Sequence, residues 1–361
     1  MTNSMIDNGG IENGGIEDGG ELLRQARICR AMDSPFTASM LEAAKRQLRE
    51  TSRTGRRIAD WPGNRGHAAV ALRLAGGFHA LARAGASDAL TALYQNRTGD
   101  FDRVVADILS AQDAFLAGWL NAPPQTNEVG RAAAIMAALL MASARFGQPF
   151  ELLELGSSAG LNLNLHRYAY DLGGVAAGDP ASALRIRPEW RGPPPPNAKV
   201  EILRTRGVDI APIALADPAQ GERLMAYVWA DRDDRMARLE QAIAIARAHP
   251  PALDRGNAAA WIADRLREPQ AEGVTRAIFH SIVLQYIPAE GQAKIRAAIL
   301  EAGQRATAAR PLAWISFEWD EARNAIHLKL SCWPGDGERD IATCHPHAQW
   351  IEWHEPRHIP T

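Results

Sequence analysis

The chain has 361 residues, of which 46% are hydrophobic and 23% charged, and 40 basic against 42 acidic side chains give a formal net charge of −2. This composition fits a globular protein of about two domains and excludes wholesale disorder. The balanced charge excludes a broadly basic surface, so we expect no nucleic-acid partner. The three cysteines, Cys29, Cys332 and Cys344, are widely spaced, which excludes a disulfide framework and favours a reduced, cytoplasmic protein.

The first 20 residues are dominated by glycine pairs and acids, as in NGGIENGGIEDGGE at 8–21. Such a segment has little to bury and predicts a disordered tail over 1–20. It lacks the basic and apolar regions of a signal peptide. The longest apolar run, 132–142, lies between Arg131 and Arg145 and is shorter than the roughly 20 residues of a membrane span. It therefore predicts one buried helix and no membrane insertion.

Residues 21–147 carry helical signals. Apolar residues recur at helix-like intervals after Leu41, Val70 and Val104. Breaks rich in proline, glycine and asparagine separate these segments at 61–64, 96–99 and 123–124. We predict a helical domain over 21–147 that serves as a substrate cover or a partner surface.

From 148 to 361 short apolar runs alternate with helical stretches. Strand candidates lie at 150–155, 200–203, 277–283, 312–319, 326–332 and 349–354. The helical stretches between the earlier candidates, notably 221–248 and 257–266, predict an α/β domain with a doubly wound, mostly parallel sheet. The last three candidates follow one another through short connections and predict antiparallel C-terminal strands.

The segment ELLELGSSAGLN at 151–162 is the most informative part of the chain. Small residues from Gly156 to Gly160 let the backbone turn sharply after a strand and approach a ligand, and a following helix would point free N–H groups there. No lysine of a phosphate loop follows. Ser158 and Leu161 stand where a dinucleotide fingerprint has glycine. The spacing therefore disfavours nucleoside triphosphates and nicotinamide cofactors.

This segment resembles the first motif of class I S-adenosylmethionine-dependent methyltransferases, in which an acid on the strand is followed by a glycine-rich turn. Glu154, Gly156 and Gly160 match the motif, and Ser158 replaces its middle glycine. The resemblance implies a Rossmann-like methyltransferase fold whose turn lies against the amino-acid part of S-adenosylmethionine. The cofactor contacts that it implies here are Glu154, Gly156, Ser157, Ser158, Gly160 and Asn162.

Two further segments resemble cofactor-binding parts of that family. RGVDIAP at 206–212 is similar to the end of the second strand, which implies that Asp209 accepts the ribose hydroxyls. More residues separate Asp209 from the first motif than separate the corresponding acid from that motif in the family. Either an insertion over 168–197 explains the gap, or 183–187 is the second strand and Glu189 is the acid. RGNA at 255–258 resembles the family segment whose polar side chain contacts the adenine. The resemblance implies that Asn257 makes this contact, although Asn257 is equally a good N-cap for the helix that follows.

RAIFHSIVLQYIP at 276–288 resembles the fourth strand of the family and the turn behind it. His280 at the strand end is a candidate acid or base, because a neutral imidazole suits proton transfer near pH 7. Tyr286 on the turn is a second candidate. For both, the alternative is a packing role. Methyltransferases that methylate amino groups of nucleic acids or proteins carry a characteristic tetrapeptide. This tetrapeptide is absent here, which favours a small-molecule acceptor.

The polar segment QTNEVGR at 125–131 precedes the apolar helix. In one interpretation Thr126 or Asn127 is the N-cap of that helix and Glu128 favours its positive end. In the other, Asn127, Glu128 and Arg131 line a substrate pocket between the domains. Together with ELGSSAGLNLN at 154–164, HSIVLQY at 280–286 and HPHAQWIEW at 345–353, the polar segment resembles an uncharacterised bacterial family that pairs a helical region with a methyltransferase-like domain. The histidine-rich C-terminus has no metal-ligand spacing, and no metal is expected.

The sequence therefore predicts methyl transfer from S-adenosylmethionine to a small molecule, with a non-catalytic binding or scaffolding module as the alternative. Because the turn would approach the cofactor closely, a bulky residue at Gly156 is expected to abolish cofactor binding without unfolding the chain. Neither the acceptor nor the oligomeric state is indicated by the sequence.

Overall fold

The computed structural model describes residues 20–335 and 337–354, and the chain forms two compact units. The first unit contains the chain up to Thr126 together with 217–237, and the second contains 127–216 and the chain from Arg238 onward. The predicted tail lies, except for Gly20, outside the described residues. The boundary differs from the predicted one at 147, because helix α8 (Ala132–Phe146) packs on the sheet of the second unit.

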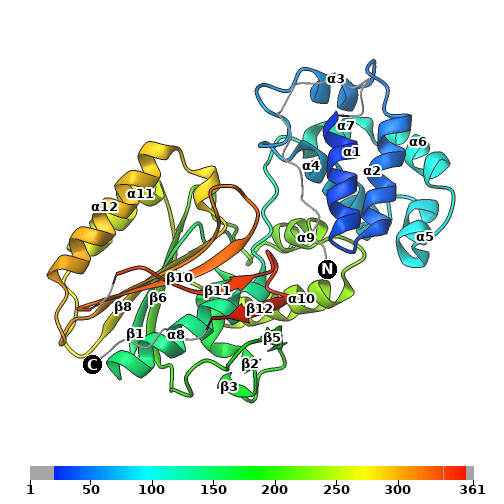
Figure 1. The fold of residues 1–361 in the computed structure, drawn as a ribbon. Helices are drawn as coiled ribbons and strands as arrows, with labels where there is room; N and C mark the ends of the chain where they lie inside the picture. Colours follow the sequence, from blue (N-terminus) through cyan, green and yellow to red (C-terminus); the bar gives the residue numbers. More distant parts are fainter. Residues whose placement is uncertain (1–19, 336, 355–361) are drawn as a thin grey trace. The chain divides into compact units, whose positions relative to one another are not determined.

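The first unit is helical. Its helices are α1 (Gly20–Ala31), α2 (Pro35–Gln47), α3 (Arg53–Ala59), α4 (Val70–Arg83), α5 (Asp88–Asn96), α6 (Phe101–Ala111), α7 (Asp113–Trp119), α9 (Pro218–Ala226) and the start of α10 (Asp233–Ala248) (Figure 1). The predicted apolar positions Leu41, Val70 and Val104 are all buried. The predicted helix over 221–248 is interrupted between α9 and α10, and its first part joins this unit.

A carboxylate ties that distant segment to the helices. Asp231 accepts hydrogen bonds from the backbone N–H groups of Phe36 and Thr37, at 2.8 and 3.0 Å, and from the Thr37 hydroxyl at 2.8 Å. These donors belong to the first turn of α2, where N–H groups have no partner within the helix. Asp231 therefore acts as an N-cap supplied from far along the chain, which no local sequence pattern reveals.

Unit 1 also buries a histidine, His79 on α4. Its Nδ1 lies 3.2 Å from the carbonyl oxygen of Ala226 and 3.0 Å from that of Val228, and the residue is 8% exposed. Burial, followed by the charge of Arg83, lowers the pKa of His79 to about 4. In the unfolded chain the same imidazole has a pKa near its ordinary value of 6.5.

This difference predicts acid sensitivity. Between pH 6.5 and about 4 the unfolded chain holds a proton on His79 that the folded chain does not, so the free energy of unfolding decreases as the pH falls through this window. The full contribution is about 3 kcal/mol. Urea unfolding of the wild type and of His79→Asn at pH 7, 5.5 and 4.5 tests this. His166, whose pKa burial also lowers to about 4, remains in both proteins. Equal pH dependence of the two proteins would contradict the prediction.

The second unit is a mixed α/β structure around a large sheet. Its nine strands run in the order β5-β12-β11-β10-β9-β8-β1-β6-β7. They are β1 (Phe150–Leu155), β5 (Glu189–Arg191), β6 (Ile202–Asp209), β7 (Leu253–Arg255), β8 (Thr275–Ser281), β9 (Leu312–Trp319), β10 (Ile326–Trp333), β11 (Arg339–Cys344) and β12 (Trp350–Trp353). The strands from β7 to β9 are parallel, β9 to β12 pair antiparallel, and β12 pairs with β5 in parallel. The predicted antiparallel end is confirmed, although β11 was not predicted.

Helices cover the sheet. α11 (Ala258–Arg267) and α12 (Ala289–Arg305) share an apolar core with Leu153 and Leu155 of β1, whereas α8 packs on β9 and β10 (Figure 1). The α8 segment is the one helix among the described residues that is long and apolar enough to cross a membrane. Of the apolar window Val129–Phe146, 72% is buried inside the protein. The predicted buried helix is thus confirmed.

The first part of the predicted insertion over 168–197 forms separate structure, whereas β5 near its end joins the edge of the large sheet. Strands β2 (Ala169–Leu172), β3 (Val175–Gly178) and β4 (Arg185–Ile186) form a small sheet of their own. The alternative second strand at 183–187 corresponds to β4 and is therefore not part of the large sheet. Short helices η2 (Val129–Arg131), η3 (Leu161–Arg167) and η4 (Leu284–Tyr286) complete the unit.

A buried ion pair joins the central strands of the large sheet. Glu151 on β1 lies opposite Arg276 on β8, with 2.9 Å between Arg276 Nε and Glu151 Oε2, and their side chains are 9% and 3% exposed. The guanidinium also donates to three carbonyl oxygens around the end of α11, those of Arg265, Glu268 and Pro269. On the other side, the exposed Arg204 of β6 contacts Glu151 at 2.9 Å. This pair is therefore both desolvated and extensively hydrogen-bonded.

Candidate functional site

The turn after β1 has an unusual backbone. Gly156, Ser158 and Gly160 have φ values of 70°, 53° and 70°, in the left-handed region that favours glycine. Ser158, which replaces the middle glycine of the motif, therefore keeps a glycine-like conformation. A Cβ atom on Gly156 would lie 2.2 Å from Val283 Cγ2, and one on Gly160 would lie 2.8 Å from Pro251 Cγ. Both glycines are required by packing as well as by φ.

This packing corrects one expectation from the sequence. A bulky side chain at Gly156 would collide with Val283 and would have to adopt a positive φ. Such a variant would be destabilised, so loss of binding in it would not report on a ligand contact. A test of this turn needs substitutions that keep its backbone.

Asp209 holds one side of the turn. It ends β6, the parallel neighbour of β1, and its Oδ2 accepts from the Ser158 N–H at 2.8 Å while Oδ1 accepts from the Ala211 N–H at 2.8 Å. Glu189, the alternative acid, begins β5 at the far edge of the sheet, next to β12. Of the two acids, only Asp209 lies beside the turn, because parallel strands bring their carboxyl ends to the same edge.

Asn127 holds the other side of the turn. Its Oδ1 accepts from the N–H groups of Ala159 and Leu161, at 3.2 and 3.0 Å, and both of these residues are buried. Asn127 is therefore neither a helix cap nor, through this oxygen, a substrate contact. It braces the motif from a segment that precedes it by a whole helix, and the sequence analysis missed this role because no spacing rule connects the two segments.

Further hydrogen bonds within the protein limit what the turn can bind. The N–H groups of Gly156 and Ser157 donate to Val208 O, and that of Gly160 donates to Ser157 O. The Ser157 hydroxyl is fully buried and donates to Glu154 O at 3.1 Å. The expected free N–H groups are thus occupied by the protein itself. The turn is not preorganised for an anion such as a phosphate.

Glu154 is the chemically distinctive group of the site. It lies near the carboxyl end of strand β1 and is 2% exposed, and its Oε2 has no hydrogen-bond partner among the described residues. Burial, and then the nearby Asp209, raise the pKa of Glu154 well above its ordinary value, against a hydrogen bond from Asn162. Asn162 Oδ1 is likewise buried without a partner. Two desolvated acceptors side by side suit a hydrogen-bond donor, above all a cationic one.

His280 lies at the end of β8, as expected, but in a closed network. The indole N–H of Trp314 donates to His280 Nε2 at 3.0 Å, so Nδ1 carries the ring proton and donates to Glu318 Oε1 at 2.7 Å. The same oxygen accepts from the N–H groups of Val283 and Leu284. The imidazole is fully buried and has both nitrogens occupied. These contacts support the packing role, in which His280 orients the carboxylate that holds the turn after β8.

Glu318 and Trp314, both on β9, were not predicted. An acid at the end of an apolar strand, as in WISFEW at 314–319, is the one signal that could have indicated Glu318. Tyr286 is 69% exposed on η4 and is open to a ligand. Asn257 is the N-cap of α11, and its Oδ1 accepts from the N–H groups of Ala259 and Ala260. Its oxygen is therefore engaged in capping.

Glu128 and Arg131 are engaged within the second unit. Glu128 is buried, caps η2 and lies 3.6 Å from Arg238 Nη1. Arg131 donates to the carbonyl oxygens of Pro346 and Ser281, at 2.9 and 3.0 Å. The helix that Glu128 caps is the short η2, whereas the apolar helix α8 has no side-chain cap; a substrate contact by Glu128 or Arg131 stays a prediction. The described residues include no group of three or more side chains suited to a metal ion. Within the described part of the chain the three cysteines are buried and form no disulfide.

Fold and site together define an α/β protein with a braced, glycine-containing turn and two acids at the carboxyl ends of adjacent parallel strands. A family model described as "Uncharacterized protein conserved in bacteria (DUF2332)" matches residues 20–353, and the chain belongs to this family. The predicted resemblance to an uncharacterised bacterial family is therefore confirmed. Comparisons with curated proteins and with solved structures gave no match.

Proposed function

We propose that this protein binds S-adenosylmethionine at the carboxyl ends of β1 and β6 and transfers its methyl group to a small-molecule acceptor. The observation that carries the proposal is the buried Glu154, whose Oε2 has no hydrogen-bond partner among the described residues. A buried acidic oxygen without a partner is costly unless a ligand donates to it. The ammonium group of the cofactor is a donor of the required charge.

The sheet topology supports the same location. The chain runs from β1 outward through β6 and β7, and then returns to the other side of β1 with β8 and β9. In doubly wound sheets, ligands bind at the carboxyl ends of the strands where the order reverses. The turn from Gly156 to Gly160 follows β1, the strand at this reversal.

Each acid has a distinct task in the proposal. Glu154 would hold the ammonium group by accepting a hydrogen bond as the carboxylate, and its proton would pass to the solvent on binding. Asp209 uses one lone pair of each oxygen for the protein's N–H groups, and its remaining lone pairs are available to ribose hydroxyls. When bound, the cofactor supplies an electrophilic methyl group on a sulfonium. Because His280 has no unoccupied nitrogen, we assign the rate enhancement to placement of the acceptor nucleophile rather than to proton removal by this residue.

Titration calorimetry with S-adenosylmethionine and S-adenosylhomocysteine tests the binding step. We expect Glu154→Gln and Asp209→Asn each to weaken binding about 10- to 100-fold, the effect of losing a hydrogen bond to a charged group. Glu189→Gln is the matched control, since Glu189 is exposed and pairs with Arg191 at the far edge of the sheet, and it should bind like the wild type. Absence of heat in the wild type at high micromolar ligand would refute the proposal.

A second candidate function is cofactor binding without catalysis. The closed hydrogen-bond network of His280 favours it, because the residue best placed as a base is unavailable. Formation of S-adenosylhomocysteine in the presence of small-molecule acceptors separates the two functions. Cofactor binding with no turnover across a broad acceptor panel would favour the binding module.

A further inference from the structure

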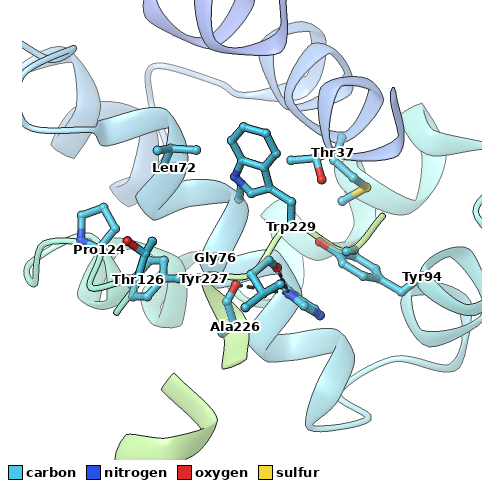
Figure 2. Close-up of a pocket in the computed structure, with 14 residues that line it drawn as sticks. Thr37, Leu72, Gly76, Tyr94, Pro124, Thr126, Ala226, Tyr227 and Trp229 are labelled. Carbon is cyan, nitrogen blue, oxygen red and sulfur yellow. Dashed lines mark hydrogen bonds between the residues drawn. The ribbon is translucent and has the colours of Figure 1, made fainter. Parts of the chain in front are cut away.

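The first unit contains a cavity that is separate from the proposed cofactor site and is lined entirely by residues of that unit. Its volume is about 30 Å³. Side chains from α2, α4 and α5 line it together with the segments 124–126 and 226–230, and Figure 2 shows Leu72, Tyr94 and Trp229 around it. A single water molecule needs roughly 10–15 Å³ of such space. The enclosed part therefore fits a small chemical group, while a larger body would extend toward the opening.

One polar atom in this lining has a defined chemical state. Backbone carbonyl oxygens only accept, so His79 Nδ1, which faces the carbonyl oxygens of Ala226 and Val228, must carry the ring proton. His79 Nε2 is consequently an acceptor. The hydrogen bonds of the His79 ring to described residues are those of Nδ1, and the residue is only 8% exposed. Burial lowers the pKa of His79 to about 4, so this lone pair is available at neutral pH.

Besides His79, the lining combines hydroxyl-bearing side chains, among them Thr37 and Thr126, with apolar and aromatic ones. The Tyr94 ring stacks on the imidazole of His79, with ring centroids 5.2 Å apart and an interplanar angle of 14°. Met40, Leu72 and Trp229 supply further apolar surface. The Thr37 hydroxyl is already used as a donor to Asp231. A charged ligand would therefore find no counter-charge in this lining, whereas a planar apolar body with one donor group matches it.

We propose that this cavity is a binding site for a small, neutral, planar molecule that donates one O–H or N–H hydrogen bond to His79 Nε2. The bond fixes the donor end of the ligand in the enclosed part, and the aromatic and aliphatic lining contacts its apolar body. A site whose acceptor would otherwise stay unpaired discriminates against analogues that lack the donor. The proposal is independent of S-adenosylmethionine binding.

Phenol and anisole are suitable probes, because methylation removes the donor and leaves the ring. We expect calorimetry or ligand-observed NMR on the full chain at pH 7.5 to show phenol binding at least about tenfold more tightly than anisole. His79→Asn places a donor near the carbonyl oxygens of Ala226 and Val228 but removes the Nε2 acceptor, and it should abolish the preference. Ala75→Leu, which narrows the cavity at another lining residue, should weaken both probes.

Thermal unfolding of each unliganded variant identifies any variant that fails to fold. In that case the ratio of the phenol and anisole affinities of the wild type tests the proposal by itself. Equal affinities for phenol and anisole would overturn the proposal. Absence of binding up to the solubility limit, which would leave only water in the cavity, or a phenol preference that survives in folded His79→Asn, would overturn it as well.

Discussion

Replacement of Arg276 by methionine is expected to lower the free energy of unfolding of the second unit by about 3–5 kcal/mol. Arg276 and Glu151 lie opposite each other on β8 and β1, and both side chains are at least nine-tenths buried. Without the guanidinium, Glu151 keeps only the exposed Arg204 as a partner, and three carbonyl oxygens around the end of α11 lose their donor. Uncompensated burial of charge is the reason for the large cost.

The chain provides a matched control in Arg206→Met. Arg206 pairs with Asp254 across β6 and β7 at 2.7 Å, with side chains 48% and 29% exposed, and its loss should cost less than about 1 kcal/mol. The double variant Glu151→Leu/Arg276→Met should recover part of the stability, because no buried charge remains. Urea unfolding, with hydrogen exchange of β1 and β8 as a local readout, measures all three. Equal costs for the two arginine substitutions would refute the prediction.

Replacement of Asn127 by alanine is expected to destabilise the second unit by about 2–6 kcal/mol and to weaken binding at the turn after β1. The change leaves the N–H groups of Ala159 and Leu161 buried without an acceptor, and each such group costs about 1–3 kcal/mol. The turn would then lose one of the two side chains that brace it, the other being Asp209. Urea unfolding and cofactor calorimetry report the two effects separately.

Asn257→Ala is the matched control for this experiment. Asn257 Oδ1 also accepts from two backbone N–H groups, but at the exposed start of α11, where water can replace it. Its loss should cost about 0.5–2 kcal/mol. Asn127→Asp, which keeps an acceptor at the same position, should preserve most of the stability and the binding. If Asn127→Asp behaves like Asn127→Ala, the acceptor role assigned to Asn127 is incorrect.

The sequence predicted the elements whose pattern is local. The strands at 150–155 and 312–319 are short, mainly apolar runs, and the structure places β1 and β9 at these bounds. The helix at 257–266 begins with its own capping residue, and Asn257 caps α11 as the residue type suggested. Periodicity, caps and breakers act over a few residues, so they can be recognised without the fold.

Other predictions depended on which distant segments meet. The helical signals of α8 did not reveal that this helix packs on the sheet, and those of 217–237 did not reveal that Asp231 caps α2. The predicted base His280 lies at the expected strand end, yet Trp314 and Glu318 from the neighbouring strand occupy both of its nitrogens. Sequence spacing predicts position along the chain, whereas availability of a side chain depends on its neighbours in space.

The sequence by itself determined that a strand ends in an acid and a tight small-residue turn, and that Asp209 or Glu189 could complement it. Only the tertiary structure decided between these acids, because the pairing of β6 with β1 brings Asp209 to the turn while β5 carries Glu189 to the far edge of the sheet. It likewise decided that Asn127 and Asp209 occupy the N–H groups of the turn and that Glu154 keeps an unpartnered oxygen. Strand order and hydrogen-bond partners arise from contacts between residues remote in sequence, which local propensity does not encode.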